Sequence, residues 1–343
     1  TADKLPIILS DFGSGLSFLS AYEELAQRYQ LQQVAAKVRG PWSRSRALNI
    51  GIRACETTWV LMTDADMIFH PDLIPMWRSY HSQLGDRFMY LAQCMKLPPI
   101  NNLPVSWSSR DYESAAARGR LFDTHGQGGC QILPTAWLRS VRGFNENYVV
   151  WGLEDNDLSF RAGLDGIEPI WMHPAKLLHQ WHIKAVPTQA RNTNRSQYED
   201  LLRNPRLLVN EEQWGTVRPE EVADYERYGP KEPLPTPEYS TAKEVEQAIL
   251  SARSDAEFVE LLLRWGNHAL HFRQDETALE TFEDALTLDP TNKTALLGLA
   301  QSHALQNGYT RASHYAAKAL ALDPYDAAIR SFIEQAMALS ARI

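Results

Sequence analysis

The stretch TWVLMTDADMIFHPD (58–72) decides how the first half of the chain is interpreted. Its apolar run predicts a buried strand, and Asp64 and Asp66 follow at the end of that strand. Residues two apart on a regular strand face the same side, so we expect both carboxylates at one point of the sheet edge. Two carboxylates at one point repel unless a cation lies between them, and Mg²⁺ or Mn²⁺ prefers such oxygen ligands. A turn after the strand, where Asp is common, is the alternative explanation.

Strands and helices alternate around this stretch. The expected elements are strands over 5–10, 32–38 and 58–69, and helices over 16–29 and 43–55. Ser43 is the expected N-cap of the second helix. Such alternation is typical of an α/β domain with a largely parallel sheet, in which ligands bind at the carboxyl ends of strands. Asp11, like Asp64, lies at such an end.

A second acidic group lies in the stretch WGLEDNDLSFRAG (151–163). The residues after the acids keep helical spacing, which places Glu154 and Asp155 in the first turn of a helix. Acids there also stabilise a helix through its macrodipole, by ~0.3–1 kcal/mol each, without any ligand. Asp157 is expected to do only this. Upstream, Gly128 and Gly129 allow the backbone to approach a ligand closely.

The last hundred residues have a different organisation. LTLDPTN (286–292) returns as LALDPYD (320–326), with Pro290 and Pro324 separated by 34 residues. This period and its spacing of small and large residues resemble the tetratricopeptide repeat. An ordinary helical bundle with coincidental spacing is the alternative. We therefore expect an α/β domain over 1–228, a Pro-rich linker over 229–240 and an all-α repeat domain over 241–343.

The composition excludes several classes of protein. The net charge of −8 argues against nucleic-acid binding, and no apolar run approaches the ~20 residues that span a bilayer. The three cysteines, Cys55, Cys94 and Cys130, are scattered, form neither a disulfide framework nor a zinc motif, and suit a reducing compartment. These features predict a cytoplasmic protein without a transmembrane segment.

Three segments together carry a family resemblance. ILSDFGSG, SRSRALNIGIRA and TDADMIF, in that order, resemble the nucleotide-sugar half of GT-A fold glycosyltransferases of the family 2 type. The resemblance implies that Asp11 binds the uracil edge of a UDP-sugar and that Arg44 and Arg46 lie near its diphosphate. It also implies that Asp64 and Asp66 hold the ribose and a metal ion. A solvated helix face is the alternative for the two arginines. The family also has a strand before the D-x-G-S strand, in the middle of the sheet. This earlier strand is missing ahead of LPIILS in the sequence, so we expect a gap in the nucleobase site.

The segment from Gly143-Phe144-Asn145-Glu146 to Arg161 resembles galactosyltransferases and chondroitin-polymerase-like or polypeptide GalNAc-transferase-like enzymes. This resemblance implies that Asp155 is the general base of an inverting transfer. It implies that Glu154 holds acceptor hydroxyls and that Trp151 offers an apolar face to a sugar ring. Gly128 and Gly129 are the expected donor-binding glycines.

Related enzymes bring a histidine from the segment after this helix to the metal. His179 is the first choice here and His182 the second, with Asp66 as the carboxylate ligand and Asp64 as its alternative. Packed, hydrogen-bonded histidines are the other explanation of this loosely spaced pair.

The resemblance therefore implies a hexosyl- or N-acetylhexosaminyltransferase that uses Mn²⁺ or Mg²⁺ and a UDP-sugar. The acceptor would be a glycan or a protein, and the repeats would bind a protein partner, mediate self-association or attach the enzyme to a membrane-associated glycan-assembly complex. A retaining enzyme of the same fold, or a non-catalytic interaction protein with a degenerate GT-A domain, are the alternatives.

Overall fold

The computed structural model describes residues 5–98, 106–121, 127–182, 188–229 and 254–341, and between 229 and 254 only 244, 247–248 and 251–252. The chain divides into two compact units. The first, called the α/β unit here, contains residues 1–96, 108–179 and 186–234. The second, the helical unit, contains residues 235–343 with the short segments 97–107 and 180–185. Most of the predicted linker, 230–240, lies outside the described residues.

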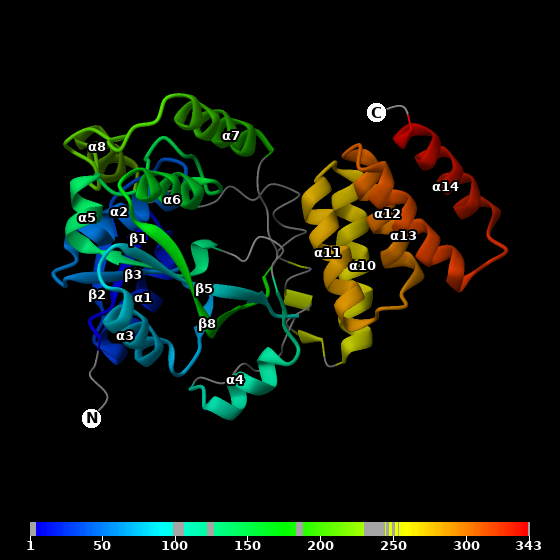
Figure 1. The fold of residues 1–343 in the computed structure, drawn as a ribbon, viewed down its shortest axis with the longest axis horizontal. Coiled ribbons are helices and arrows are strands. Elements are labelled where there is room, and N and C mark those ends of the chain that lie inside the picture. The colour runs from blue at the N-terminus through cyan, green and yellow to red at the C-terminus, as the bar shows by residue number, and fades with distance from the viewer. Residues whose placement is uncertain are drawn as a thin grey trace. The chain divides into compact units, whose positions relative to one another are not determined.

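The α/β unit contains two separate sheets (Figure 1). The first is a parallel pair, β1 (Ile8–Phe12) and β2 (Gln32–Ala36), joined by α1 (Leu16–Tyr29). The second has the order β3-β7-β5-β8-β4, with β6 paired to β5. Its strands are β3 (Trp59–Met62), β4 (Met67–Phe69), β5 (Phe88–Lys96), β6 (Arg120–Leu121), β7 (Gln131–Pro134) and β8 (Glu168–His179). Among the described residues, β1 and β3 do not pair with each other.

The GT-A resemblance implies a Rossmann-like mixed, largely parallel sheet; its mixed character is confirmed, and its largely parallel character is wrong. Among the strands that the structure describes, β1 with β2 and β5 with β8 run parallel, whereas β3–β7, β4–β8, β5–β6 and β5–β7 are antiparallel. Alternating strands and helices produce parallel neighbours only when consecutive strands lie side by side. In the six-stranded sheet, strands that are distant in the sequence are neighbours instead. The sheet is therefore mixed.

Helices cover both faces of the six-stranded sheet. Its middle strand β5 alternates between two cores: Met89 and Leu91 belong to one, and Tyr90 and Ala92 to the other. The first core also takes side chains from α2, α5 and α6, and the second from α3.

Besides α1, the described helices of this unit are α2 (Arg44–Ala54), α3 (Leu73–Leu84), α4 (Ser109–Ala116), α5 (Thr135–Ser140), α6 (Glu154–Leu164), α7 (Thr188–Arg203) and α8 (Pro219–Tyr228), with a 3₁₀ turn at Gln127–Gly129.

Helix α2 begins where the sequence predicts. The Ser43 hydroxyl accepts a hydrogen bond from the Arg46 amide, as expected of an N-cap. The helix then buries Asn49 and Ile52, and its packing beside β1 is fixed by the bond from Ser10 Oγ to the Ala47 carbonyl, 2.6 Å. Helix α2 thereby links β1 to the core of the other sheet.

The helical unit is a stack of helices in which each packs against the next. They are α10 (Asp255–His271), α11 (Asp275–Leu288), α12 (Lys293–Leu305), α13 (Tyr309–Leu322) and α14 (Ala327–Ser340). The ring of Phe282 lies so close to Gly266 and Gly298 that a methyl group at either glycine would overlap it. These two glycines therefore allow α10 and α12 to pack on the same aromatic side chain of α11.

Two further expectations concern the whole described chain. No described helix is both long and apolar enough to cross a membrane. Cys55, Cys94 and Cys130 are all buried, and none of the three forms a disulfide.

Candidate active site

The two acids that follow β3 do not share one face. The chain leaves the strand at Met62 and turns, so Asp64 and Asp66 lie in the connection to β4 and not on a regular strand. The alternation that would put them on one side does not apply in a turn. Asp64 is bonded to Arg44, and Asp66 Oδ2 lies 3.3 Å from His179 Nε2. The two carboxylates therefore have different partners and lie in different parts of the site.

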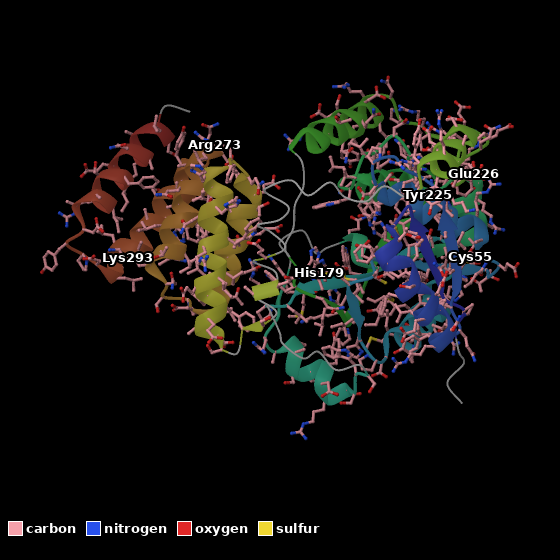
Figure 2. The ribbon with its side chains drawn as sticks, turned by 180° about the vertical axis from the view of Figure 1, so that it is seen from behind. Cys55, His179, Tyr225, Glu226, Arg273 and Lys293 are labelled. Carbon is pink, nitrogen blue, oxygen red and sulfur yellow. The ribbon has the colours of Figure 1, made fainter. Side chains whose placement is uncertain are left out.

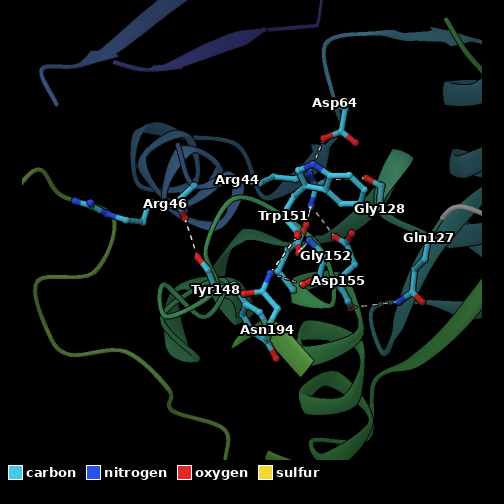
Figure 3. Close-up of polar contacts among 12 residues, drawn as sticks. Arg44, Arg46, Asp64, Gln127, Gly128, Tyr148, Trp151, Gly152, Asp155 and Asn194 are labelled. Carbon is cyan, nitrogen blue, oxygen red and sulfur yellow. Dashed lines mark hydrogen bonds and ion pairs between the residues drawn. The ribbon is translucent and has the colours of Figure 1, made fainter. Parts of the chain in front are cut away.

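Arg44 joins the two acidic segments (Figure 3). Its guanidinium is buried, with 6% of the residue exposed. Its Nε donates to Asp64 at 2.6 Å, and its Nη1 donates to Asp155 at 2.8 Å and to Glu154 at 3.2 Å. Its Nη2 donates to the Gly128 carbonyl at 2.9 Å. The segment after β3 and the start of α6, about ninety residues apart, therefore meet at one cation.

One guanidinium faces three carboxylates, and this charge imbalance affects their protonation. Burial first, and the neighbouring Asp155 second, raise the pKa of Glu154 to about 7, while Arg44 opposes the shift. Burial also raises the pKa of Asp155, again opposed by Arg44 and increased by Asp64. The Glu154 carboxylate also accepts a hydrogen bond from the Gly152 amide. The cluster can therefore hold a proton near neutral pH, as an acid–base site requires.

The structure gives a reason for glycine at position 128 that is separate from the expected approach of a ligand. A methyl group on its Cα would overlap the carboxylate of Asp155. The glycine therefore makes room for the acid of the site itself. Gly129 is buried, and a methyl group there would lie 3.3 Å from the end of the flexible Met67 side chain, which a small shift of that side chain would relieve.

Replacing Gly128 with alanine should lower catalytic turnover by about 10²-fold, because the Asp155 carboxylate must move by roughly an ångström. The melting temperature should change little. Gly163→Ala in α6 is the matched control, since a methyl group there meets nothing within 4 Å. Steady-state kinetics of both variants checks this prediction, and equal activity of the two would contradict it.

The other predicted donor residues lie apart from this cluster. Asp11 is buried, and its Oδ1 accepts a hydrogen bond from the Ser14 amide at 3.2 Å. Arg46 makes a two-bond ion pair with Glu221, both bonds at 2.7 Å, and lies over the ring of Phe12. Its guanidinium is thus directed to α8, and the expected diphosphate contact has no support in this geometry.

The candidate metal ligands lie at the end of β8, where Figure 2 labels His179. Met67 pairs with His179 across β4 and β8, which brings the adjacent Asp66 to the imidazole. One ligand atom from each of Asp66, His179 and His182 lies within 4.8 Å of the others. A carboxylate oxygen with imidazole nitrogens is a set that Mn²⁺ and related divalent ions accept. Lys96, also buried, pairs with His179 in the parallel register of β5 and β8 and adds a cation that sequence patterns did not indicate.

Asp157 is more than a first-turn acid, which corrects our expectation. Asp157 and Arg161 are both fully buried, and Arg161 Nε donates to Asp157 at 2.6 Å. Asn145 donates to the same carboxylate, and Arg161 also donates to the carbonyls of Gly143 and Leu207. The i, i+4 spacing of Asp157 and Arg161 was a usable signal, but burial of the pair depends on the long-range packing of α6.

Two asparagines also shape the site, and neither was predicted from the sequence as a site residue. Asn49 of α2 is fully buried, donates to the Phe144 carbonyl and to Glu146, and accepts from the Phe144 amide. Asn194 of α7 donates to the carbonyl of Trp151. Trp151 itself is half-buried, just before α6. An asparagine in a helix carries no sequence signal for these distant backbone partners.

Comparisons with known proteins give one family match. Residues 15–199, more than half of the 343-residue chain, match the family model described as "Glycosyltransferase like family 2". A search of curated proteins found no match.

Solved structures are also similar to this chain, and two of these weak similarities are described here. The catalytic domain of Drosophila β1,4-galactosyltransferase 7 in complex with xylobiose is 14% identical, with a TM-score of 0.33 over 56% of this chain and 80% of that chain. A mutant of the same enzyme in complex with manganese, UDP-Gal and xylobiose is 13% identical, with a TM-score of 0.27 over 55% and 79%.

Proposed function

Because the chain belongs to the family described as glycosyltransferase like family 2, we propose that its α/β unit transfers a sugar from a UDP-sugar to an acceptor hydroxyl. We propose that transfer occurs with inversion and that Asp155 is the general base. The observation that carries this proposal is the Arg44 contact that joins Asp64, on the predicted donor side, to Asp155 at 2.8 Å. A base must lie near both reactants, and this contact supports such a place for Asp155.

In this mechanism, Asp155 removes the proton of the acceptor hydroxyl as the oxygen attacks the anomeric carbon. Arg44 holds the carboxylate in place and favours its ionised form against the effect of burial. Glu154 is 2% exposed and already bonded to Arg44 and Gly152. It therefore supports the backbone before α6 and reaches an acceptor hydroxyl only by exchanging one of these contacts. Trp151 is the proposed apolar contact for a sugar ring.

On the donor side, Asp11 is the proposed partner of the uracil and Asp64 of the ribose. Asp66 and His179, with His182 beside them, are the proposed holders of a divalent cation. Such a cation, when bound, neutralises the charge that develops on a diphosphate leaving group. Lys96 next to His179 is placed to add positive charge to the same region.

Removal of the metal should weaken the binding of UDP by at least about tenfold, because the diphosphate then lacks its counter-charge. Titration calorimetry of the whole chain with UDP, with Mn²⁺ and with EDTA, measures this. Asp66→Ala should reproduce the effect of EDTA in the presence of Mn²⁺. Asp72→Ala is the control, since Asp72 is an exposed acid six residues further on.

Two outcomes decide between this proposal and its alternatives. UDP binding that is equal with and without Mn²⁺ would remove the metal from the proposal. No UDP binding in any condition would favour a non-catalytic scaffold. For an active enzyme, the anomeric configuration of the product, read by NMR, separates inversion from retention.

We also propose that the helical unit is tetratricopeptide-like and binds a protein partner. The 34-residue spacing of Pro290 and Pro324 and the small residues against Phe282 support this. A groove of about 540 Å³ lies on α10, α12 and α14. Its lining combines apolar and polar side chains, among them Leu270, His271, Gln301, Phe332 and Arg273, which Figure 2 labels. Such a lining suits an extended peptide that carries hydrogen-bond acceptors.

A further inference from the structure

We propose that Asn194 of α7 is a positioning residue for the acceptor side of the site, an inference that rests on the proposed glycosyl transfer. Asn194 is 1% exposed and comes from a helix that follows the metal-ligand segment. Its side chain fixes the backbone of the Trp151-Gly152 segment, on which both the predicted sugar-ring contact and Glu154 depend.

The backbone from Val150 to Leu153 is held in an unfavourable conformation. Val150 has φ 59°, Gly152 has φ 109° and Leu153 has φ 72°. Glycine tolerates such values, but a β-branched valine rarely adopts a positive φ. Residues of this kind persist only where the surrounding structure over-determines them, and they gather at functional sites. The segment therefore needs external support to keep its shape.

One support comes from α2. Ser43 and Val150 form an isolated parallel bridge, in which the Arg44 amide donates to the Val150 carbonyl at 2.9 Å. The Val150 amide donates to the Trp42 carbonyl at 3.2 Å. The Ser43 hydroxyl also donates to the Tyr148 carbonyl. These bonds fix the residues up to Val150 but none of them reaches Trp151 or Gly152.

Asn194 supplies the support beyond that point (Figure 3). Its Oδ1 accepts from the Val149 amide at 2.9 Å, and its Nδ2 lies 3.0 Å from the carbonyl of the same residue. The same Nδ2 lies 3.1 Å from each of the Trp151 and Gly152 carbonyls. One side-chain NH₂ group, with its two N–H donors, thus lies against three carbonyls, those of Val149, Trp151 and Gly152, on both sides of the strained Val150.

The effect of Asn194 extends to the acids through a single peptide group. The carbonyl of Trp151 accepts from Asn194, and the N–H of the same peptide, on Gly152, donates to Glu154. Rotation of this peptide would therefore break both contacts together. Glu154 in turn shares Arg44 with Asp155. Asn194 acts on the base only through these groups, so we describe it as a positioning residue.

Among side chains of this length, only asparagine carries both an acceptor oxygen and N–H donors. Aspartate keeps the acceptor for the Val149 amide but loses the donor and brings a negative charge to three carbonyls. Alanine removes both. The buried carbonyls then lack their donor, which is costly for polar groups away from water. The two substitutions therefore separate the acceptor role of the side chain from its donor role.

Hydrogen–deuterium exchange of the whole chain tests the structural part. In Asn194→Ala, the amides of Val149 and Gly152 should exchange at least about tenfold faster than in the wild type. In Asn194→Asp, Val149 should keep most of its protection while Gly152 loses it. Ser196→Ala, an exposed position on the same helix, is the control and should change neither. Unchanged exchange at Gly152 in both Asn194 variants would overturn the proposal.

Binding and kinetics test the functional part. The affinity for UDP with Mn²⁺ should stay within twofold of the wild type in both Asn194 variants. Transfer, with the donor and acceptor identified by a UDP-release screen, should fall at least 20-fold, with a raised KM for the acceptor. A loss of UDP affinity parallel to the loss of transfer would show a general structural role and overturn the inference. If the wild type transfers no sugar, the proposed function fails, and exchange at Gly152 still decides whether Asn194 holds this segment.

Discussion

Asp155→Asn should lower the rate of sugar transfer by about 10³-fold while leaving UDP binding nearly unchanged. The amide keeps the size of the carboxylate and can accept from Arg44, but it cannot take a proton from the acceptor hydroxyl. General-base catalysis typically contributes about 10²–10⁴-fold, and a buried base with a raised pKa falls in the upper part of that range. Turnover is measured by UDP release and binding by calorimetry with Mn²⁺.

The control for this variant is Asp165→Asn, at the exposed end of the same helix, where the side chain accepts from Trp137. Both variants remove one negative charge from α6, so a general charge effect would appear in both. Transfer that survives Asp155→Asn would show that the base is another group. A loss of UDP affinity together with transfer would mean that Asp155 belongs to the donor side.

Arg161→Met should destabilise the α/β unit by about 3–5 kcal/mol, because it leaves the Asp157 carboxylate buried without its cation. The pair is fully buried at 2.6 Å, and the same guanidinium also donates to the carbonyls of Gly143 and Leu207. Urea denaturation followed by tryptophan fluorescence reports the loss. The double variant Asp157→Asn with Arg161→Met should regain part of it, since no unpaired charge then remains.

Arg206→Met provides the comparison on the surface. Its partner Asp200 lies at 2.9 Å, but both side chains are 40% or more exposed. Such pairs contribute little, so the denaturation midpoint should hardly move. Equal losses of stability in Arg161→Met and Arg206→Met would mean that the buried pair stabilises this fold no more than the exposed pair does.

Local patterns in the sequence predicted much of the fold correctly. The cap of α2 at Ser43, the strand expected over 32–38 and found at Gln32–Ala36, and the helix that begins at Glu154 all follow from apolar spacing and short-range hydrogen bonding. Strand direction in the six-stranded sheet did not follow, because β7 inserts between β3 and β5. That arrangement depends on pairings between residues far apart in the sequence, from Leu91 with Gln131 to Trp59 with Pro134, which periodicity does not encode.

For the site, residue types were predictable and partners were not. Spacing indicated that Asp64, Glu154 and Asp155 carry chemistry, but not that Arg44 meets all three. Arg46 appears equivalent in sequence, two positions on, yet it binds Glu221 because its side chain leaves α2 in another direction. The choice between these partners is made by packing around α2, beyond the reach of a linear pattern.

The bonding of helix α2 to several parts of the α/β unit has a consequence for evolution. This one short helix bonds to β1 through Ala47, to the acids through Arg44 and to the loop before α6 through Asn49. A substitution that shifts the axis of α2 would therefore move β1, the acids and the loop before α6 together. If the proposed function holds, specificity for the donor and specificity for the acceptor cannot change independently through α2, and mutations there should be epistatic with changes on either side. Diversification of such an enzyme would proceed instead through the loops that α2 does not touch.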